Sequence, residues 1–163
     1  MRKLIDAKSK QEGRNESRLP EFGEFWSKKL KGSFDFLGLN HYTSRLAFPR
    51  KSSEPSWEGD QNVGTKFDPS WPKSGSAWLR MVPWGFRKIL NWIKKTYGNP
   101  LVRVTENGWS DGPEVGLEDG TRALYYQLYM NELLKAVNLD GCNVKSYAAW
   151  SLMDNFEWAR GYS

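Results

Sequence analysis

Polar and aromatic side chains follow three short apolar segments of the sequence, and their types could do chemistry together. These groups are Asn-His-Tyr at 40–42, Glu-Asn at 106–107 and Asp-Asn-Phe-Glu-Trp at 154–158. Asn, Asp and Gly also end strands and begin turns for structural reasons alone. The same kind of polar ending after three successive strands favours a shared site, because the carboxyl ends of parallel strands meet at one edge of a sheet or barrel.

The segments that must position these groups are predicted to be buried strands. They are apolar runs bounded by glycine, proline or polar residues, at 34–40, 101–105 and 144–152. Helices are expected between them, which gives an alternation of strand and helix. Such alternation indicates a parallel sheet with crossover helices, and three strands are too few to close a barrel.

Two amphipathic helices are expected between these strands. Pro83 suits the first position of one helix, and Gly-Asn-Pro at 98–100 should end it. Its apolar face is expected to consist of Phe86, Ile89, Leu90, Ile93 and Tyr97. The second helix is expected over 121–137, with its apolar residues on or near one face: Leu124, Leu128, Leu134 and Val137.

The remaining segments have weaker patterns. Residues 1–17 are polar and charged, and we expect them to be loose or linker-like. A short helix is expected over 21–30. Residues 44–77 are rich in Ser, Pro, Gly and Trp without a sustained period, which indicates a long loop. The sequence contains no internal repeat.

Composition excludes several classes of protein. Lys and Arg exceed Asp and Glu by 24 to 19, for a net charge of +5. These basic residues are scattered rather than gathered in a stripe, so a nucleic-acid partner is not expected. No run of about 18 apolar residues or signal-peptide hydrophobic region occurs, so we expect no membrane insertion by this segment. One cysteine and no metal-ligand spacing imply no disulfide, metal or cofactor.

Aromatic residues make up 15% of the chain, including nine tryptophans. Composition alone favours a thick aromatic core. The alternative is that some tryptophans form flat apolar platforms for the C–H faces of sugar rings.

A set of motifs in the expected order makes the chain resemble glycoside hydrolase family 1. The central motif is Thr-Glu-Asn-Gly at 105–108 after an apolar strand, which is similar to the family's nucleophile motif. The other matching segments are Phe-Asp-Phe-Leu-Gly-Leu-Asn-His-Tyr-Thr at 34–43, Val-Pro-Trp-Gly-Phe-Arg at 82–87, Tyr-Gly-Asn-Pro at 97–100 and Ala-Trp-Ser-Leu-Met-Asp-Asn-Phe-Glu-Trp at 149–158.

The resemblance implies a partial (β/α)8 TIM barrel of the α/β class. The chain would hold about strands 6 to 8 and their intervening helices, as the C-terminal portion of a single glycosidase domain over 1–163. TIM barrels typically need about 250 residues, so we expect the whole barrel to require more chain. The family's acid/base motif, Thr-x-Asn-Glu-Pro, does not occur in this sequence. A secreted or extracellular location is implied for the full-length protein.

The resemblance also implies roles for particular residues in a retaining β-glycosidase acting on β-glycosides. Glu106 matches the catalytic nucleophile, and Tyr42 matches the phenol that hydrogen-bonds it. Four residues match groups that bind the sugar: Asn40, Trp150, Glu157 and Trp158. His41 is expected to point to the opposite face of its strand and to be packed rather than catalytic.

Two functions remain open at this point. The leading hypothesis is hydrolysis of β-linked glucosides, galactosides or similar glycosides by the protein to which this segment belongs, with weak or no turnover by the isolated chain. The alternative is a catalytically inactive relative or fragment that binds a sugar or a protein. Retention of Glu106, Tyr42 and Glu157 together favours the enzyme.

Overall fold

The structure is a computed structural model that describes residues 2–112 and 114–162. The chain divides into two compact units. The first combines residues 1–33 with 45–68, and the second combines 34–44 with 69–163. Each unit is described by itself below.

The second unit contains a three-stranded parallel sheet in the order β1-β4-β5. The strands are β1 (Leu37–Asn40), β4 (Val102–Glu106) and β5 (Val144–Tyr147). All three predicted strands and their parallel pairing are present. β1 and β5 are shorter than the predicted 34–40 and 144–152, because both pair only along the five residues of β4.

Helix α4 (Pro83–Tyr97) begins at the predicted proline and ends before Gly98, which has the positive φ of 73° that favours glycine. Its buried side chains include Phe86, Leu90 and Ile93. Tyr97 was predicted to lie on the same face, but it is 57% exposed and packs edge-on against Trp92.

Helix α5 (Gly120–Asn138) buries a different face from the one predicted. Its buried residues are Tyr125, Tyr129, Leu133 and Ala136, whereas Leu124 and Leu134 are exposed. Leu128 and Val137 pack at the margin of the core. The prediction from leucines was wrong because the tyrosine rings supply the apolar area, while their hydroxyls find hydrogen-bond partners inside the unit.

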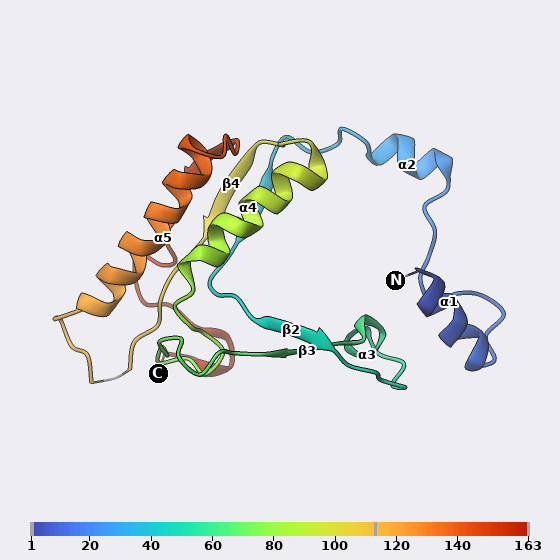
Figure 1. Cartoon of the computed structure of the whole chain (residues 1–163), viewed down its shortest axis with the longest axis horizontal. Coiled ribbons are helices and arrows are strands. Elements are labelled where there is room, and N and C mark those ends of the chain that lie inside the picture. Colours follow the sequence, from blue (N-terminus) through green and yellow to red (C-terminus); the bar gives the residue numbers. More distant parts are fainter. Residues whose placement is uncertain (1, 113, 163) are drawn as a thin grey trace. The chain divides into compact units, whose positions relative to one another are not determined.

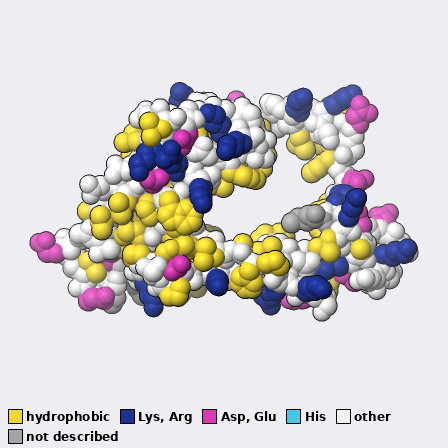
Figure 2. Space-filling model, viewed as in Figure 1, with side chains coloured by type: hydrophobic (Ala, Val, Ile, Leu, Met, Phe, Trp, Pro, Cys, Tyr) yellow, Lys and Arg dark blue, Asp and Glu magenta, His cyan; other side chains and the backbone are white. Residues whose placement is uncertain are grey.

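The two long helices pack against each other, and their side chains form one core with the strands (Figure 1). Val102 and Val104 of β4 enter this core, while the alternating residues Arg103 and Thr105 are exposed on the opposite face of the sheet. Hydrophobic side chains are also exposed over much of the face drawn in Figure 2. A sheet covered by helices on one face, with its other face open, is what part of a barrel presents.

The first unit contains regular structure where a long loop was predicted over 44–77. Strands β2 (Leu46–Pro49) and β3 (Val63–Lys66) pair in antiparallel fashion, and helix α3 (Trp57–Gln61) lies between them in sequence. Ser56 caps α3 by accepting a hydrogen bond from the backbone N–H of Gly59. The prediction failed because these elements are only four or five residues long and show no period of their own.

The N-terminal segment is also more ordered than predicted. Helix α1 (Arg2–Gln11) lies within the segment expected to be loose, 1–17, of which Met1 is outside the described residues. Helix α2 (Glu24–Leu30) falls within the predicted 21–30.

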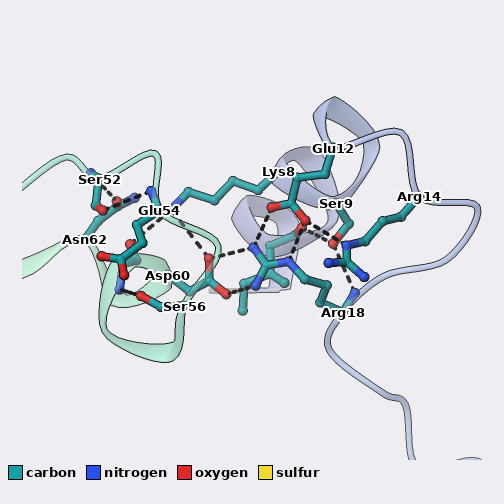
Figure 3. Close-up of polar contacts among 12 residues, drawn as sticks. Lys8, Ser9, Glu12, Arg14, Arg18, Ser52, Glu54, Ser56, Asp60 and Asn62 are labelled. Carbon is teal, nitrogen blue, oxygen red and sulfur yellow. Dashed lines mark hydrogen bonds and ion pairs between the residues drawn. The ribbon is translucent and has the colours of Figure 1, made fainter.

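Ion pairs explain the order of α1 (Figure 3). The guanidinium of Arg18 binds both carboxylate oxygens of Asp60, at 2.5 and 2.9 Å, and also binds Glu12. Lys8 of α1 donates to the carbonyl of Gly59 at 3.0 Å. Side chains far apart in the sequence thus tie α1 to α3, and single-sequence periodicity does not report such contacts.

Candidate active site

The carboxylate of Glu106 and the phenol of Tyr42 lie together at the carboxyl ends of neighbouring strands. Glu106 ends β4, and it pairs with Asn40, the last residue of β1, after a register shift between Leu39 and Asn40. The backbone N–H of His41 donates to the carbonyl of Glu106 at 3.0 Å, which joins the carboxyl ends of β1 and β4. The Tyr42 hydroxyl then donates to Oε2 of Glu106 at 2.6 Å.

The environment of Tyr42 keeps its hydroxyl protonated. Partial burial raises the pKa of the phenol above its ordinary range, and the hydrogen bond and negative charge of Glu106 raise it further. The charge of Glu157 acts in the same direction. Tyr42 therefore donates to Glu106 as a neutral phenol at physiological pH, and the indole of Trp78 packs edge-on against its ring.

Asn40 lies beside this pair. Its amide oxygen accepts a 2.5 Å hydrogen bond from the hydroxyl of Thr105, the residue before Glu106. Because the oxygen accepts this bond, the NH2 group is the other hydrogen-bonding part of the Asn40 amide.

Two of the three predicted residues of the C-terminal segment are brought together. The indole Nε1 of Trp150 donates to Oε1 of Glu157 at 2.8 Å. The backbone N–H of Trp150 donates to the carbonyl of Asn107 at 2.9 Å, which ties this segment to the end of β4. Trp158 begins a short 3-10 helix, η1 (Trp158–Arg160), and is 87% exposed. Among the described residues, its indole has no hydrogen bond or ring contact.

His41 is packed on the far side of its strand, as predicted. Its imidazole stacks on Phe86 of α4, with ring centres 5.0 Å apart and planes 18° from parallel. Burial lowers the pKa of His41 to about 4, so the ring is neutral at physiological pH. The imidazole takes no part in the polar cluster around Glu106, to which His41 contributes only its backbone.

Comparison with known proteins identifies the family. The sequence pattern of glycosyl hydrolase family 1 matches residues 4–163. The chain belongs to glycosyl hydrolase family 1.

The relatives that this chain resembles include two human proteins named as glycosidases. Human lactase/phlorizin hydrolase is 47% identical over 165 residues, covering 100% of this chain and 8% of its own length. Human cytosolic beta-glucosidase is 41% identical over 161 residues, covering 98% of this chain and 34% of its own length. The chain therefore spans about a third or less of these relatives.

Solved structures agree with this assignment. Aphid myrosinase superimposes with a TM-score of 0.87 at 43% identity, covering 100% of this chain and 35% of that protein. A family 1 beta-glucosidase from the fungus Humicola insolens, solved with glucose, superimposes with a TM-score of 0.80 at 40% identity, covering 96% of this chain and 35% of that protein. The α/β arrangement is part of the family 1 TIM barrel. Within the described residues, no helix is long and apolar enough to cross a membrane.

Sequence reasoning missed a second polar cluster in this family 1 segment, directly behind Glu106. It consists of Asn107, Tyr125, Tyr129 and Tyr147, which hydrogen-bond one another or the backbone of residues 41–42. A usable signal was the spacing of Tyr125 and Tyr129, four residues apart and thus on one face of α5. No sequence pattern showed that this face, rather than the leucine face, turns inward.

Proposed function

We propose that the protein to which this chain belongs is a retaining β-glycosidase, with Glu106 as its nucleophile. The observation that carries the proposal is the 2.6 Å hydrogen bond from Tyr42 to Glu106 at the carboxyl ends of adjacent parallel strands. In this reading β1, β4 and β5 are strands 6, 7 and 8 of the barrel. Active sites of TIM barrels lie at that end of the strands.

Glu106 acts as a carboxylate that attacks the anomeric carbon of the sugar. The glycosidic oxygen leaves as the glycosyl-enzyme ester forms, and water then hydrolyses the ester with retention of configuration. Tyr42 holds one carboxylate oxygen, Oε2, through its hydroxyl. Attack thus falls to the other oxygen, and Tyr42 also orients the group before the reaction.

A retaining glycosidase needs a second carboxyl group about 5–5.5 Å from the first, to protonate the leaving group. In this proposal that acid/base residue lies outside the chain, in the part of the barrel that the relatives have and this segment does not span. The isolated chain is accordingly a weak or inactive catalyst. Its unpaired sheet edges also favour association between chains.

The remaining site residues bind the sugar. Glu157 accepts hydrogen bonds from two hydroxyls, as a carboxylate can, and the Trp150 indole lies against the apolar face of the ring. The Trp150–Glu157 hydrogen bond keeps the two groups in one arrangement. Asn40 donates through its NH2 group, and Trp158, exposed here, donates its indole N–H to a hydroxyl. The substrate class is β-glucosides, β-galactosides or similar β-glycosides.

The proposal is tested in a fusion that supplies the rest of the barrel. This chain replaces the segment of human cytosolic beta-glucosidase to which it aligns, and hydrolysis of an aryl β-glucoside is measured. We expect turnover by the fusion and its loss in Glu106→Gln, because an amide does not form the glycosyl ester. Glu118→Gln, which changes an exposed carboxylate between β4 and α5, is the matched control and should keep full activity. Equal activity of both variants would contradict the proposal.

A further inference from the structure

Asn107, the residue after Glu106, is completely buried and has every polar atom of its side chain occupied. Its Nδ2 donates to the carbonyl of His41 at 2.7 Å and to the hydroxyl of Tyr125 at 2.8 Å. Its Oδ1 accepts from the hydroxyl of Tyr147 at 2.6 Å. These partners come from the end of β1, from α5 and from β5, so one side chain connects three elements.

The network continues to the backbone of Tyr42. The hydroxyls of Tyr125 and Tyr129 both donate to the carbonyl oxygen of Tyr42, at 2.7 and 3.0 Å. The Tyr129 hydroxyl is held in turn by the backbone N–H of Val82, just before α4, at 3.0 Å. The hydrogen bonds from Tyr125 and Tyr129 thus hold the main chain of Tyr42, and the phenol of Tyr42 donates to Glu106.

The hydroxyls of this network remain donors across the physiological pH range. Burial is the main cause that raises the pKa of all three phenols, to about 12 for Tyr129 and beyond the usual range for Tyr125 and Tyr147. Each of the three hydroxyls donates to an oxygen atom within 3.0 Å: the Tyr42 carbonyl for Tyr125 and Tyr129, and Oδ1 of Asn107 for Tyr147. A buried polar network in which every member is satisfied fixes a single geometry.

The backbone around Asn107 is equally constrained. Its carbonyl accepts from the N–H of Trp150. At the next residue, Gly108, a Cβ atom would lie 2.0 Å from the carbonyl oxygen of Trp150, so only glycine permits this approach. The end of β4 is therefore set against the Trp150 segment on one side and the residue 41–42 backbone on the other.

We propose that Asn107 is a positioning residue, which acts with Tyr125, Tyr129 and Tyr147 to hold the Tyr42 phenol and the Glu106 carboxylate in register. The side chain does not touch the reacting atoms. It fixes the backbone on both sides of the Tyr42–Glu106 bond, and its effect on catalysis rests on the proposed role of Glu106. Loss of the network lets the two side chains drift apart without removing either one.

The structural part of this proposal is tested on the full 163-residue chain, with tyrosines labelled by 13C at Cζ and observed by NMR. Glu106→Gln identifies the Tyr42 signal, because that signal loses its charged acceptor. We expect the same signal to move in Asn107→Ala, and also in Tyr125→Phe, which removes one hydroxyl but keeps the ring. Asn91→Ala is the control: it removes amide bonds to Asp140 and the Arg87 carbonyl elsewhere in the same unit, and should leave the signal in place.

A Tyr42 signal that stays at its wild-type position in Asn107→Ala overturns the proposal. If Asn107→Ala does not fold, Tyr125→Phe provides the test. A Tyr42 signal that stays at its wild-type position in Tyr125→Phe also overturns the proposal. A shift of similar size in Asn91→Ala also overturns it, because the effect would then be a general loosening of the core.

Turnover of the fusion separates this proposal from the proposed function. We expect Asn107→Ala to lower kcat roughly tenfold or more, with KM changed much less, because misplacement of reacting groups affects the chemical step. A rise in KM with unchanged kcat counts against positioning. Full activity of Glu106→Gln instead removes the proposed function, and it leaves the NMR result on the network standing.

Discussion

Tyr42 and Glu106 are separated by 64 positions in the sequence, yet the phenol of one donates a 2.6 Å hydrogen bond to the carboxylate of the other. The contact exists because β1 and β4 pair in parallel and both side chains emerge where their strands end. Partial burial keeps the phenol neutral, so it can serve as a donor. The strand pairing thus places a neutral donor against the carboxylate that is proposed to react.

Tyr42→Phe should lower kcat/KM of the fusion about 100-fold, because a preorganised donor to a reacting carboxylate is lost while the ring remains. Tyr162→Phe, which removes an exposed hydroxyl from a ring that packs edge-on against Phe156, should have no effect. Steady-state kinetics with an aryl β-glucoside measure both variants. Wild-type kcat/KM in Tyr42→Phe would show that the phenol has no part in the reaction.

Trp150→Phe should raise KM about threefold to tenfold and change kcat less. The substitution keeps an aromatic ring but removes the indole N–H that holds Oε1 of Glu157, a charge-assisted hydrogen bond at a partly exposed position. Trp92→Phe is the matched control, since that ring packs on Tyr97 in α4 and is also partly exposed. A similar KM in both variants would argue against a role for Trp150 in holding Glu157.

Acid should destabilise the second unit through His41. In the folded chain its pKa is lowered to about 4, whereas the unfolded chain binds the proton as pH falls through about 6.5. The stability contributed by the neutral ring is therefore fully present above pH ~6.5 and is lost between there and about 4, by up to about 3 kcal/mol. Urea unfolding at pH 7 and pH 4.5 should show a smaller acid loss in His41→Gln. An identical loss in both proteins would contradict this assignment.

Asp60→Asn should release α1 from α3, because Arg18 and Lys8 lose the carboxylate that they share. We expect faster limited trypsin cleavage after Arg14, in the connection that follows α1. Glu24→Gln breaks an exposed ion pair with Lys28 in the same unit and should not change the cleavage rate. Equal cleavage of Asp60→Asn and the wild type would mean that the ion pairs do not hold the helix.

Long elements with a strong period were predictable from the sequence, and short ones were not. Pro83 and Gly98 mark the ends of α4, and three apolar runs mark the strands of the sheet. The β2–β3 pair was missed because its strands are only four residues long, and α1 was missed because its order depends on ion pairs with the distant residue Asp60. The inward face of α5 was misjudged, since leucine is more apolar than tyrosine but cannot use a buried hydrogen bond.

Contacts between candidate residues were predictable where both residues belong to family motifs, and the roles of these residues in a site stay predictions. The contact between Tyr42 and Glu106 matches the arrangement that the family resemblance implies. Trp158, predicted to bind sugar, is exposed, and its role stays a prediction. Asn107 stands inside the nucleophile motif, but its partners Tyr125 and Tyr147 lie on other elements. Only the three-dimensional contacts show what they hold together.

Trapping the glycosyl-enzyme ester tests the role of Glu106 most directly. The fusion is incubated with a 2-deoxy-2-fluoro-β-glucoside carrying an activated leaving group, which forms the ester faster than water removes it. Fragmentation of the tryptic peptide 104–122 by mass spectrometry then locates the sugar. We predict one fluorinated sugar on Glu106 and none in Glu106→Gln. A sugar on another carboxylate, or steady hydrolysis by the fusion without any trapped ester, would contradict the account.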